Sequence, residues 1–214
     1  MEKILSGIQA FQSDTFAEEK DLFEKLAGGQ SPQVLFITCS DSRIDPNLIT
    51  HTKPGDLFVL RTAGNIIPPY GAVRGGEAAT VEYAVDALSI PDIVVCGHSH
   101  CGAMSGLLDP PEGDSLPAVK ELLSHAIGTK RLVDQMHPAH DDAKARLNIA
   151  IEQNVIAQLD NLRTHPSVAA ALARGDVRLH GCVYEFETGD IRRFDTKHNQ
   201  FVGLHQPPED VMIA

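Results

Sequence analysis

The segment VLFITCSDSR, residues 34–43, decides the fold of this chain. It begins with an apolar run typical of a buried strand, Val34–Thr38, which leads directly into polar side chains. A second segment, IVVCGHSHC at residues 93–101, has the same form, with a predicted strand at Ile93–Cys96. In open parallel sheets, functional sites form where loops leave the carboxyl ends of the strands. We therefore expect the polar residues of both segments to meet at one edge of one sheet.

Three of these residues are ligand types that zinc prefers. Cys39 belongs to the first segment, and His98 and Cys101 belong to the second. Two thiolates and one imidazole form a tetrahedral zinc site whose fourth position is open, which is the catalytic rather than the structural pattern. The sequence therefore predicts one catalytic Zn²⁺ ion per chain, bound by Cys39, His98 and Cys101.

A carboxylate and an arginine follow the first thiol at close spacing. Asp41 is placed to accept a hydrogen bond at the zinc-bound nucleophile and orient it, or alternatively to bind the metal itself. A bidentate pair with Arg43 would hold the carboxylate ionised and off the metal. We therefore predict catalytic roles for Asp41 and Arg43. In the simpler alternative, Asp41, Ser42 and Asp45 only cap a turn and a following helix.

The motif C-x-D-x-R followed by H-x-x-C, in this order and at this separation, resembles the β-class carbonic anhydrases. The likeness extends from the N-terminal helix to about Asp195 and is closest to the plant-like and cyanobacterial branch. It is strongest in DLFVLR (56–61), AGNIIPPYG (63–71) and CGHSHCGAM (96–104). The resemblance implies a lyase that reversibly hydrates carbon dioxide to bicarbonate and a proton, by attack of zinc-bound hydroxide.

The resemblance also implies five residues around the substrate. Gln30 matches a glutamine that donates to substrate, often across a dimer interface, and Gly102 matches a backbone donor. Phe58, Ala63 and Tyr83 match an apolar and aromatic lining, which suits the uncharged carbon dioxide molecule. The alternatives are a linker position for Gln30 and plain core packing for Phe58 and Tyr83.

Three departures from the family pattern change what the resemblance implies. Phe36 stands where the bicarbonate-inhibited branch typically has tryptophan, so we do not expect bicarbonate to switch Asp41 onto zinc. Thr62 stands where relatives commonly have asparagine, with no consequence that we can derive. The long C-terminal extension of carboxysomal relatives is missing after Ala214, which argues against carboxysome targeting.

The composition is that of an ordinary acidic globular protein. The 214 residues carry a formal charge of −11 and a pI of about 5.3. This acidity disfavours nucleic acid and anionic membrane surfaces as partners. No secretory signal is evident, and no apolar run reaches the ~20 residues of a membrane span. Four cysteines are too few for a disulfide scaffold, so we expect a cytoplasmic protein.

The apolar periodicity predicts a single α/β domain over residues 1–214, with a central, mostly parallel sheet flanked by helices. A further strand is expected at Leu57–Arg61. A C-terminal hairpin-like edge is formed by Val177–Phe186 and Ile191–Phe194, joined by a turn at 187–190. Helices after the first strand are expected at Pro46–Thr50, Gly75–Leu88, Leu116–Met136, Asp142–Leu162 and Ser167–Arg174. Residues 196–214 are expected to form a loose tail.

The two amphipathic helices of residues 1–29 form an N-terminal arm that precedes the first strand. We expect this arm to pack on a partner subunit, giving a homodimer or a higher homo-oligomer, although packing on its own domain is an alternative.

The remaining cysteines and histidines receive simpler interpretations. Cys96 and Cys182 are expected in the core. His100 is expected to point away from His98, as a surface residue or alternatively as an auxiliary proton carrier. The other histidines of polar segments are expected to be solvated: His51, His125, His137, His140 and His165.

Two other functions remain open at this point. A hydrolase of carbonyl sulfide or carbon disulfide would use the same nucleophile on the same fold, and a substrate panel separates it from a carbonic anhydrase. A non-catalytic zinc or thiol-redox protein would have a closed four-ligand shell and no hydration activity.

Overall fold

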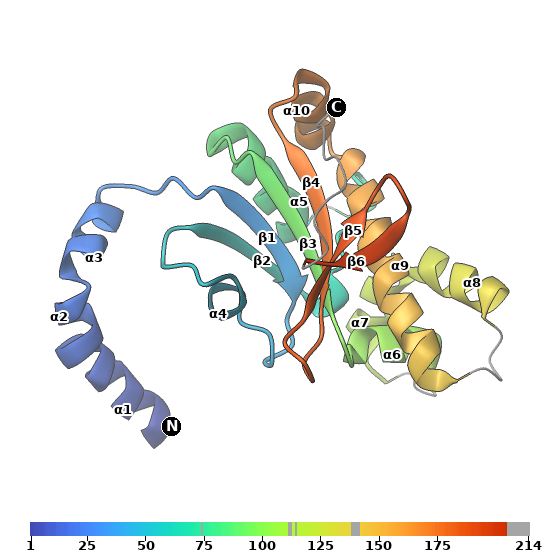
Figure 1. The fold of residues 1–214 in the computed structure, drawn as a ribbon, viewed down its shortest axis with the longest axis horizontal. Helices are drawn as coiled ribbons and strands as arrows, with labels where there is room; N and C mark the ends of the chain where they lie inside the picture. The colour runs from blue at the N-terminus through green and yellow to red at the C-terminus, as the bar shows by residue number, and fades with distance from the viewer. Residues whose placement is uncertain (74, 111–112, 114, 138–141, 205–214) are drawn as a thin grey trace.

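The computed structural model of the chain describes residues 1–73, 75–110, 113, 115–137 and 142–204. Its sheet comprises β1 (Val34–Cys39), β2 (Leu57–Thr62), β3 (Asp92–His98), β4 (Arg178–Tyr184), β5 (Ile191–Asp195) and β6 (Gln200–Gly203). The strands lie side by side in the order β2-β1-β3-β4-β5-β6 (Figure 1). Pairing is parallel from β2 to β4 and antiparallel from β4 to β6. The predicted α/β fold with a central, mostly parallel sheet is confirmed.

The two strands that lead into the site are neighbours. In the parallel pair β1–β3, Val34 lies opposite Asp92 and Thr38 lies opposite Cys96. The buried Thr38 side chain also donates a hydrogen bond to the carbonyl of Cys96 at 2.9 Å. Both strands run further than predicted, so Cys39 and His98 are their last residues rather than the first residues of the loops.

One face of the sheet packs on the long helix α9 (Ala143–Arg163) (Figure 1). Two glycines allow this close approach. A Cβ atom on Gly97 of β3 would lie 2.9 Å from Val155 Cγ2, and one on Gly181 of β4 would lie 2.9 Å from Val155 Cγ1. Since real Cβ atoms do not approach so closely, both positions favour glycine.

The same layer contains α10 (Pro166–Arg174), α5 (Gly76–Glu82) and the helical turn at Tyr83–Ala87 that continues α5. Fully buried side chains fill the space between this layer and the sheet, among them Leu35, Ile37, Ile93, Val95, Val155 and Leu162. Val81 of α5 is also fully buried in this cluster. Burial of apolar residues on both sides of this interface makes it the main core of the protein.

The opposite face carries a smaller apolar cluster with the short helix α4 (Pro46–Thr50). The side chain of Asp45 caps this helix by accepting a hydrogen bond from the Leu48 amide at 3.1 Å. The predicted helix and its cap are therefore confirmed. Cys96 is buried in this cluster, as predicted, whereas Cys182 only packs against it and is half-buried.

Two expectations outside the sheet core need correction, and one helix was not predicted. The predicted helix Leu116–Met136 is two helices, α7 (Pro117–Ser124) and α8 (Ile127–Met136), because the backbone at Ala126 leaves helical geometry at φ −107° and ψ 9°. The predicted loose tail contains β6, and its residues 205–214 lie outside the described part. A helix that was not predicted, α6 (Gly102–Leu108), directly follows Cys101.

The N-terminal arm consists of α1 (Glu2–Ala10), a π-helical turn (Phe11–Thr15), α2 (Phe16–Glu18) and α3 (Lys20–Ala27). It projects away from the sheet (Figure 1). None of its four segments contains a buried residue. An ion pair between Lys53 and Glu19, at 3.0 Å, links it to the body. The arm therefore does not cover the sheet of its own chain.

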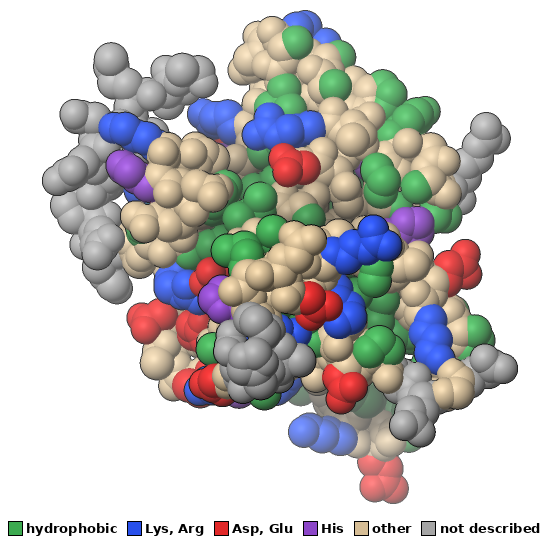
Figure 2. Space-filling view, turned by 90° about the vertical axis from the view of Figure 1, so that its right-hand side faces the viewer, with side chains coloured by type: hydrophobic (Ala, Val, Ile, Leu, Met, Phe, Trp, Pro, Cys, Tyr) green, Lys and Arg blue, Asp and Glu red, His purple; other side chains and the backbone are tan. Residues whose placement is uncertain are grey.

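Among the described residues, we find no helix that is both long and apolar enough to cross a membrane. Figure 2 shows one side of the molecule, where acidic and basic side chains are interspersed.

Candidate metal centre

Cys39, His98 and Cys101 meet at the carboxyl end of the sheet, as the sequence predicts. One ligand atom from each lies within 4.8 Å of the others, and all three residues are buried. Cys39 ends β1 and His98 ends the neighbouring β3, and Cys101 stands at the N-terminus of α6. The parallel pairing of β1 and β3 thus brings together residues that are far apart in the sequence.

The ring of His98 is oriented for metal binding. Its Nδ1 lies 2.8 Å from the carbonyl oxygen of Ser99. Because a carbonyl only accepts, Nδ1 carries the proton and Nε2 keeps its lone pair. Nε2 is buried and has no hydrogen-bond partner in the described part of the chain. An unpartnered buried nitrogen beside two thiols fits a metal ion at this position.

The two thiols interact with each other. A hydrogen bond from Cys101 lowers the pKa of the Cys39 thiol to about 4, and the same contact together with burial raises the pKa of Cys101. The amide of Gly64 also donates to the Cys39 sulfur at 3.2 Å. Gly64 has φ 68°, a left-handed conformation that favours glycine, and a Cβ atom there would lie 3.0 Å from Ala103 Cβ. The turn is therefore shaped to bring an N–H group to the thiolate.

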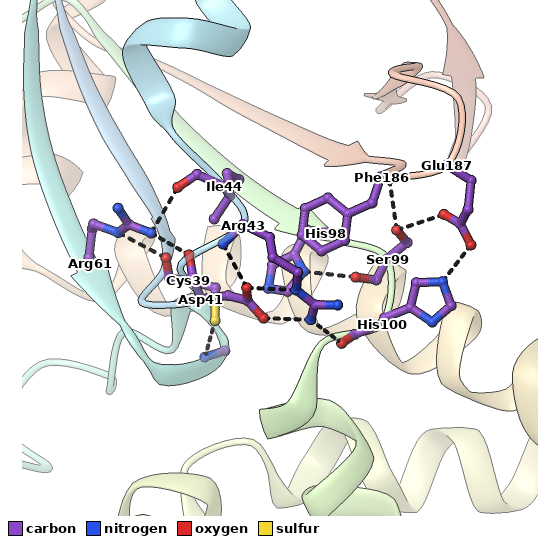
Figure 3. A network of polar contacts seen from close by, with 11 residues as sticks. Cys39, Asp41, Arg43, Ile44, Arg61, His98, Ser99, His100, Phe186 and Glu187 are labelled. Carbon is purple, nitrogen blue, oxygen red and sulfur yellow. Dashed lines mark hydrogen bonds and ion pairs between the residues drawn. The ribbon is translucent and has the colours of Figure 1, made fainter. Parts of the chain in front are cut away.

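The predicted pair of Asp41 and Arg43 is formed (Figure 3). The guanidinium donates from Nε to Oδ1 at 2.9 Å and from NH2 to Oδ2 at 2.7 Å. The backbone amide of Arg43 also donates to Oδ1 at 2.9 Å. The side-chain hydrogen bonds from Arg43 hold the pKa of Asp41 well below its usual range, so the carboxylate is ionised. Asp41 is not part of the group of mutually close metal-ligand atoms.

A second arginine, which the sequence reasoning did not single out, holds the backbone of this segment. Arg61 on β2 donates to the carbonyls of Cys39 at 3.0 Å, Asp41 at 2.6 Å and Ile44 at 2.9 Å (Figure 3). These contacts fix the path of the chain that carries Cys39 and Asp41.

The turn between β4 and β5 reaches the same site, which was also not predicted. The ring of Phe186 stacks on that of His98, and the guanidinium of Arg43 lies over it (Figure 3). Glu187 accepts hydrogen bonds from His100 Nε2 and from Ser99 Oγ. The contact with His100 lowers the pKa of Glu187 to about 2. The side chain of His100 thus points to the surface, as predicted, while its carbonyl accepts from Arg43 at 3.1 Å.

Helix α9 holds the loop after β2 through a row of amide side chains. Asn154 donates to the Gly64 carbonyl at 2.8 Å, and Gln158 accepts from the Ile67 amide at 2.9 Å. Asn161 donates to the Ile67 carbonyl at 2.9 Å. The buried backbone of this loop is therefore satisfied by side chains from a distant part of the sequence.

The predicted pocket residues are placed as follows. Phe58 and Tyr83 face each other with ring centroids 6.0 Å apart, and Tyr83 is 51 % exposed, so it is not plain core. Ala63 starts the turn that contains Gly64, and Gly102 begins α6 directly after Cys101. Gln30 is exposed in the connection between α3 and β1.

His165 differs most from its predicted exposure. His165 is buried, and its Nε2 lies 3.1 Å from the carbonyl of Pro68, because this residue closes α9 against the loop after β2. His51 is exposed, while His125 and His137 are half-buried. His140 lies outside the described residues.

The site combines two thiols with an imidazole nitrogen that has no partner among the described residues, and it lies at the edge of a parallel sheet. This is the donor set of a catalytic zinc enzyme. A profile of the family described as carbonic anhydrase matches residues 34–191. A carbonic anhydrase of Synechocystis is 48% identical over 203 residues, covering 94% of this chain and 74% of the relative. A carbonic anhydrase of Pseudomonas aeruginosa is 49% identical over 211 residues, covering 98% and 94%.

Solved structures similar to this chain belong to the same family as these relatives. The β-carbonic anhydrase CcaA superposes with a TM-score of 0.91 at 48% identity, covering 95% of this chain and 91% of the other. A structure described as one of two tetrameric β-carbonic anhydrases of Sordaria macrospora gives 0.81 at 32% identity, covering 90% and 95%. The chain belongs to the carbonic anhydrase family, in its β class. Members of this class use zinc, which the Cys-His-Cys donor set fits.

Proposed function

We propose that this enzyme performs the reversible hydration of carbon dioxide with one zinc ion held by Cys39, His98 and Cys101. The observation that carries the proposal is the buried cluster of Cys39, His98 and Cys101, whose ligand atoms lie within 4.8 Å of one another, with His98 Nε2 unpartnered among the described residues. A zinc ion there would supply a Lewis acid that lowers the pKa of water far below its bulk value.

We assign the orienting role to Asp41 and the positioning of Asp41 to Arg43. The carboxylate is ionised and therefore accepts a hydrogen bond from the attacking water, which directs the oxygen lone pair toward the carbon of carbon dioxide. The two-point contact with Arg43 keeps the carboxylate away from the ligand atoms, so the fourth position stays free for water.

We also assign substrate contacts to the five residues that the family resemblance implies. Phe58, Ala63 and Tyr83 provide an apolar wall for a molecule without charge, and the amide of Gly102 provides a donor for bicarbonate. Gln30 lies on an exposed connection next to the arm, so we propose that it acts across a subunit interface.

The arm makes a homodimer the smallest assembly we propose. Ile4, Leu5 and Ile8 are 59 %, 52 % and 50 % exposed along one helix, next to the exposed rings of Phe11 and Phe16. Apolar side chains gathered in this way mark an association surface. The Sordaria structure described as tetrameric supports assembly beyond a monomer. A cytoplasmic location, favoured by the four free thiols, stays a prediction.

Stopped-flow hydration of carbon dioxide, with protein whose zinc content has been measured, tests this function. We expect rapid hydration that scales with zinc content. Hydrolysis of carbonyl sulfide or carbon disulfide without carbon dioxide hydration would contradict the proposal, as would zinc-loaded protein without either activity.

A further inference from the structure

One aromatic ring contacts both the candidate metal ligand His98 and the arginine that holds Asp41. The centroids of the Phe186 and His98 rings are 4.9 Å apart, with an angle of 29° between their planes. The central carbon of the Arg43 guanidinium lies 4.6 Å from the centroid of the same Phe186 ring. Figure 3 shows the three side chains gathered beside Asp41.

The position of this ring is fixed from several sides. The amide of Phe186 donates to Ser99 Oγ at 2.9 Å, and Ser99 Oγ in turn donates to Glu187 at 3.2 Å. The ring of Tyr184 packs against Phe186 nearly at right angles, with centroids 5.3 Å apart. The turn between β4 and β5 therefore presents Phe186 to the site in one orientation.

Arg43 needs such a support because 51 % of its side chain is exposed. The ion pair with Asp41 and the carbonyl of His100 bind its charged end, but a long side chain in solvent has many other conformations. The face of an aromatic ring attracts a guanidinium and stacks on its flat surface. Phe186 therefore restricts Arg43 to the conformation in which both nitrogens reach Asp41.

His98 benefits from the same ring in a different way. The hydrogen bond from Nδ1 to Ser99 fixes one atom of the imidazole but leaves its plane free to tilt. Stacking on Phe186 restricts that tilt, which determines where the Nε2 lone pair points.

We propose that Phe186 is a positioning residue of this enzyme, which fixes Arg43 against Asp41 and orients the imidazole of His98. The proposal rests on the proposed function of Asp41 and Arg43. It assigns Phe186 no contact with substrate.

The test compares Phe186→Leu, which keeps apolar bulk but removes the ring, with Phe186→Tyr, which keeps the ring. We expect Phe186→Leu to retain one zinc per chain and to lose about tenfold in kcat/KM, the size of effect expected from one such contact. Phe186→Tyr should stay close to the wild type. In cobalt-substituted protein, the visible spectrum of Phe186→Leu should change in the same direction as that of Arg43→Ala, because both changes release the carboxylate of Asp41.

Phe194→Leu is the matched control. Phe194 is a half-buried ring on β5 that packs on Phe201 at a centroid distance of 5.3 Å, so its loss tests the effect of reduced stability alone. It should leave kcat/KM and the cobalt spectrum unchanged.

Wild-type values of both readouts in Phe186→Leu would overturn the proposal, as would an equal loss in Phe186→Tyr or in Phe194→Leu. If the wild-type protein did not hydrate carbon dioxide, the proposed function would fail, and the cobalt spectra would still decide the role of Phe186.

Discussion

Arg43 binds Asp41 through three donors, of which two belong to its guanidinium and one is its own backbone amide. The carboxylate therefore has little freedom to rotate toward the sulfur atoms of Cys39 and Cys101. A carboxylate held so close to metal ligands without joining them acts as a hydrogen-bond acceptor for whatever occupies the free position.

Arg43→Ala should therefore keep zinc and lose activity by more than about a hundredfold, the scale found when a polar group is removed from an active site. The reason is that Asp41 becomes free to bind the metal. Stopped-flow kinetics with parallel zinc analysis measures both quantities. Arg163→Ala, which removes an exposed arginine of α9, is the control and should be silent. Wild-type turnover in Arg43→Ala would disprove the role of Arg43 in positioning Asp41.

Cys39→Ser should lose zinc and activity together, because a hydroxyl is a far weaker zinc ligand than a thiolate. Cys182→Ser removes a half-buried thiol from the other face of the sheet and should keep one zinc per chain. Zinc analysis after dialysis separates the two variants. Full zinc occupancy in Cys39→Ser would show that the ligand assignment is wrong.

Deletion of residues 1–16 should dissociate the assembly and lower activity, although no metal ligand is touched. The deleted segment carries the exposed side chains of Ile4, Leu5 and Ile8. Sedimentation of the intact and shortened proteins at micromolar concentration measures the change. A fully active monomer of the intact protein would contradict this prediction.

Asp92→Asn should lower stability at neutral pH but not in acid. Hydrogen bonds from Arg178 hold the pKa of Asp92 below its ordinary value of 3.8. A carboxyl whose pKa is lower in the folded protein stabilises it above the unfolded pKa, and this stabilisation is lost as the pH falls through the folded pKa. We expect a loss of up to about 1 kcal/mol at pH 7, as for other partly exposed ion pairs.

Urea unfolding over a pH series measures this difference, which should shrink once the pH falls below 3.8. Asp160→Asn, at an exposed carboxylate of α9, should show a smaller difference throughout. A difference for Asp92→Asn that grows toward acid would have the wrong sign.

Gln158→Leu should destabilise the fold by about 1–3 kcal/mol, the cost of leaving a buried donor unpaired. The donor is the amide of Ile67, which binds Gln158 Oε1 at 2.9 Å. Thermal unfolding measures the loss. Gln153→Leu, on another side of α9, is the matched control and should cost much less. Equal losses in the two variants would show that the amide row has no special role.

The sequence was sufficient to predict the parallel strands and the residues at their ends. Short apolar runs preceded Cys39 and His98, and both motifs lay within a few residues of those runs. The pairing of Asp41 with Arg43 was predictable because the two residues are neighbours in the chain. Their spacing already brings the guanidinium within reach of the carboxylate.

Contacts between distant segments could not be predicted in the same way. Phe186 and Glu187 lie in a stretch that indicates a hairpin turn, and nothing local shows that the turn returns to His98. In the sequence, the amide side chains of α9 resemble the ordinary polar side of a helix. Their role is visible only in the fold, where the loop at Gly64 packs against them. His165 was expected in solvent because it lies in a polar segment, yet it is buried and its Nε2 contacts the Pro68 carbonyl.

The spacing of apolar residues also did not reveal the break that divides the predicted helix Leu116–Met136 into α7 and α8. Leu122, Val133 and their neighbours continue one helical period across Ala126, so periodicity alone predicts a single helix. The backbone leaves helical geometry at the buried Ala126, and the spacing of apolar residues does not show this change.

The placement of Cys39 and His98 on two neighbouring strands, with Cys101 at the start of α6, has a thermodynamic consequence. Because Cys39 and His98 come together only when β1 pairs with β3, an unfolded chain offers no comparable site to a metal ion. Zinc binding then stabilises the folded protein. At a free zinc concentration a thousand times the dissociation constant, it adds about 4 kcal/mol to the free energy of unfolding. The melting temperature of this enzyme therefore rises with the free zinc concentration. Metal starvation would deplete the folded protein as well as its activity.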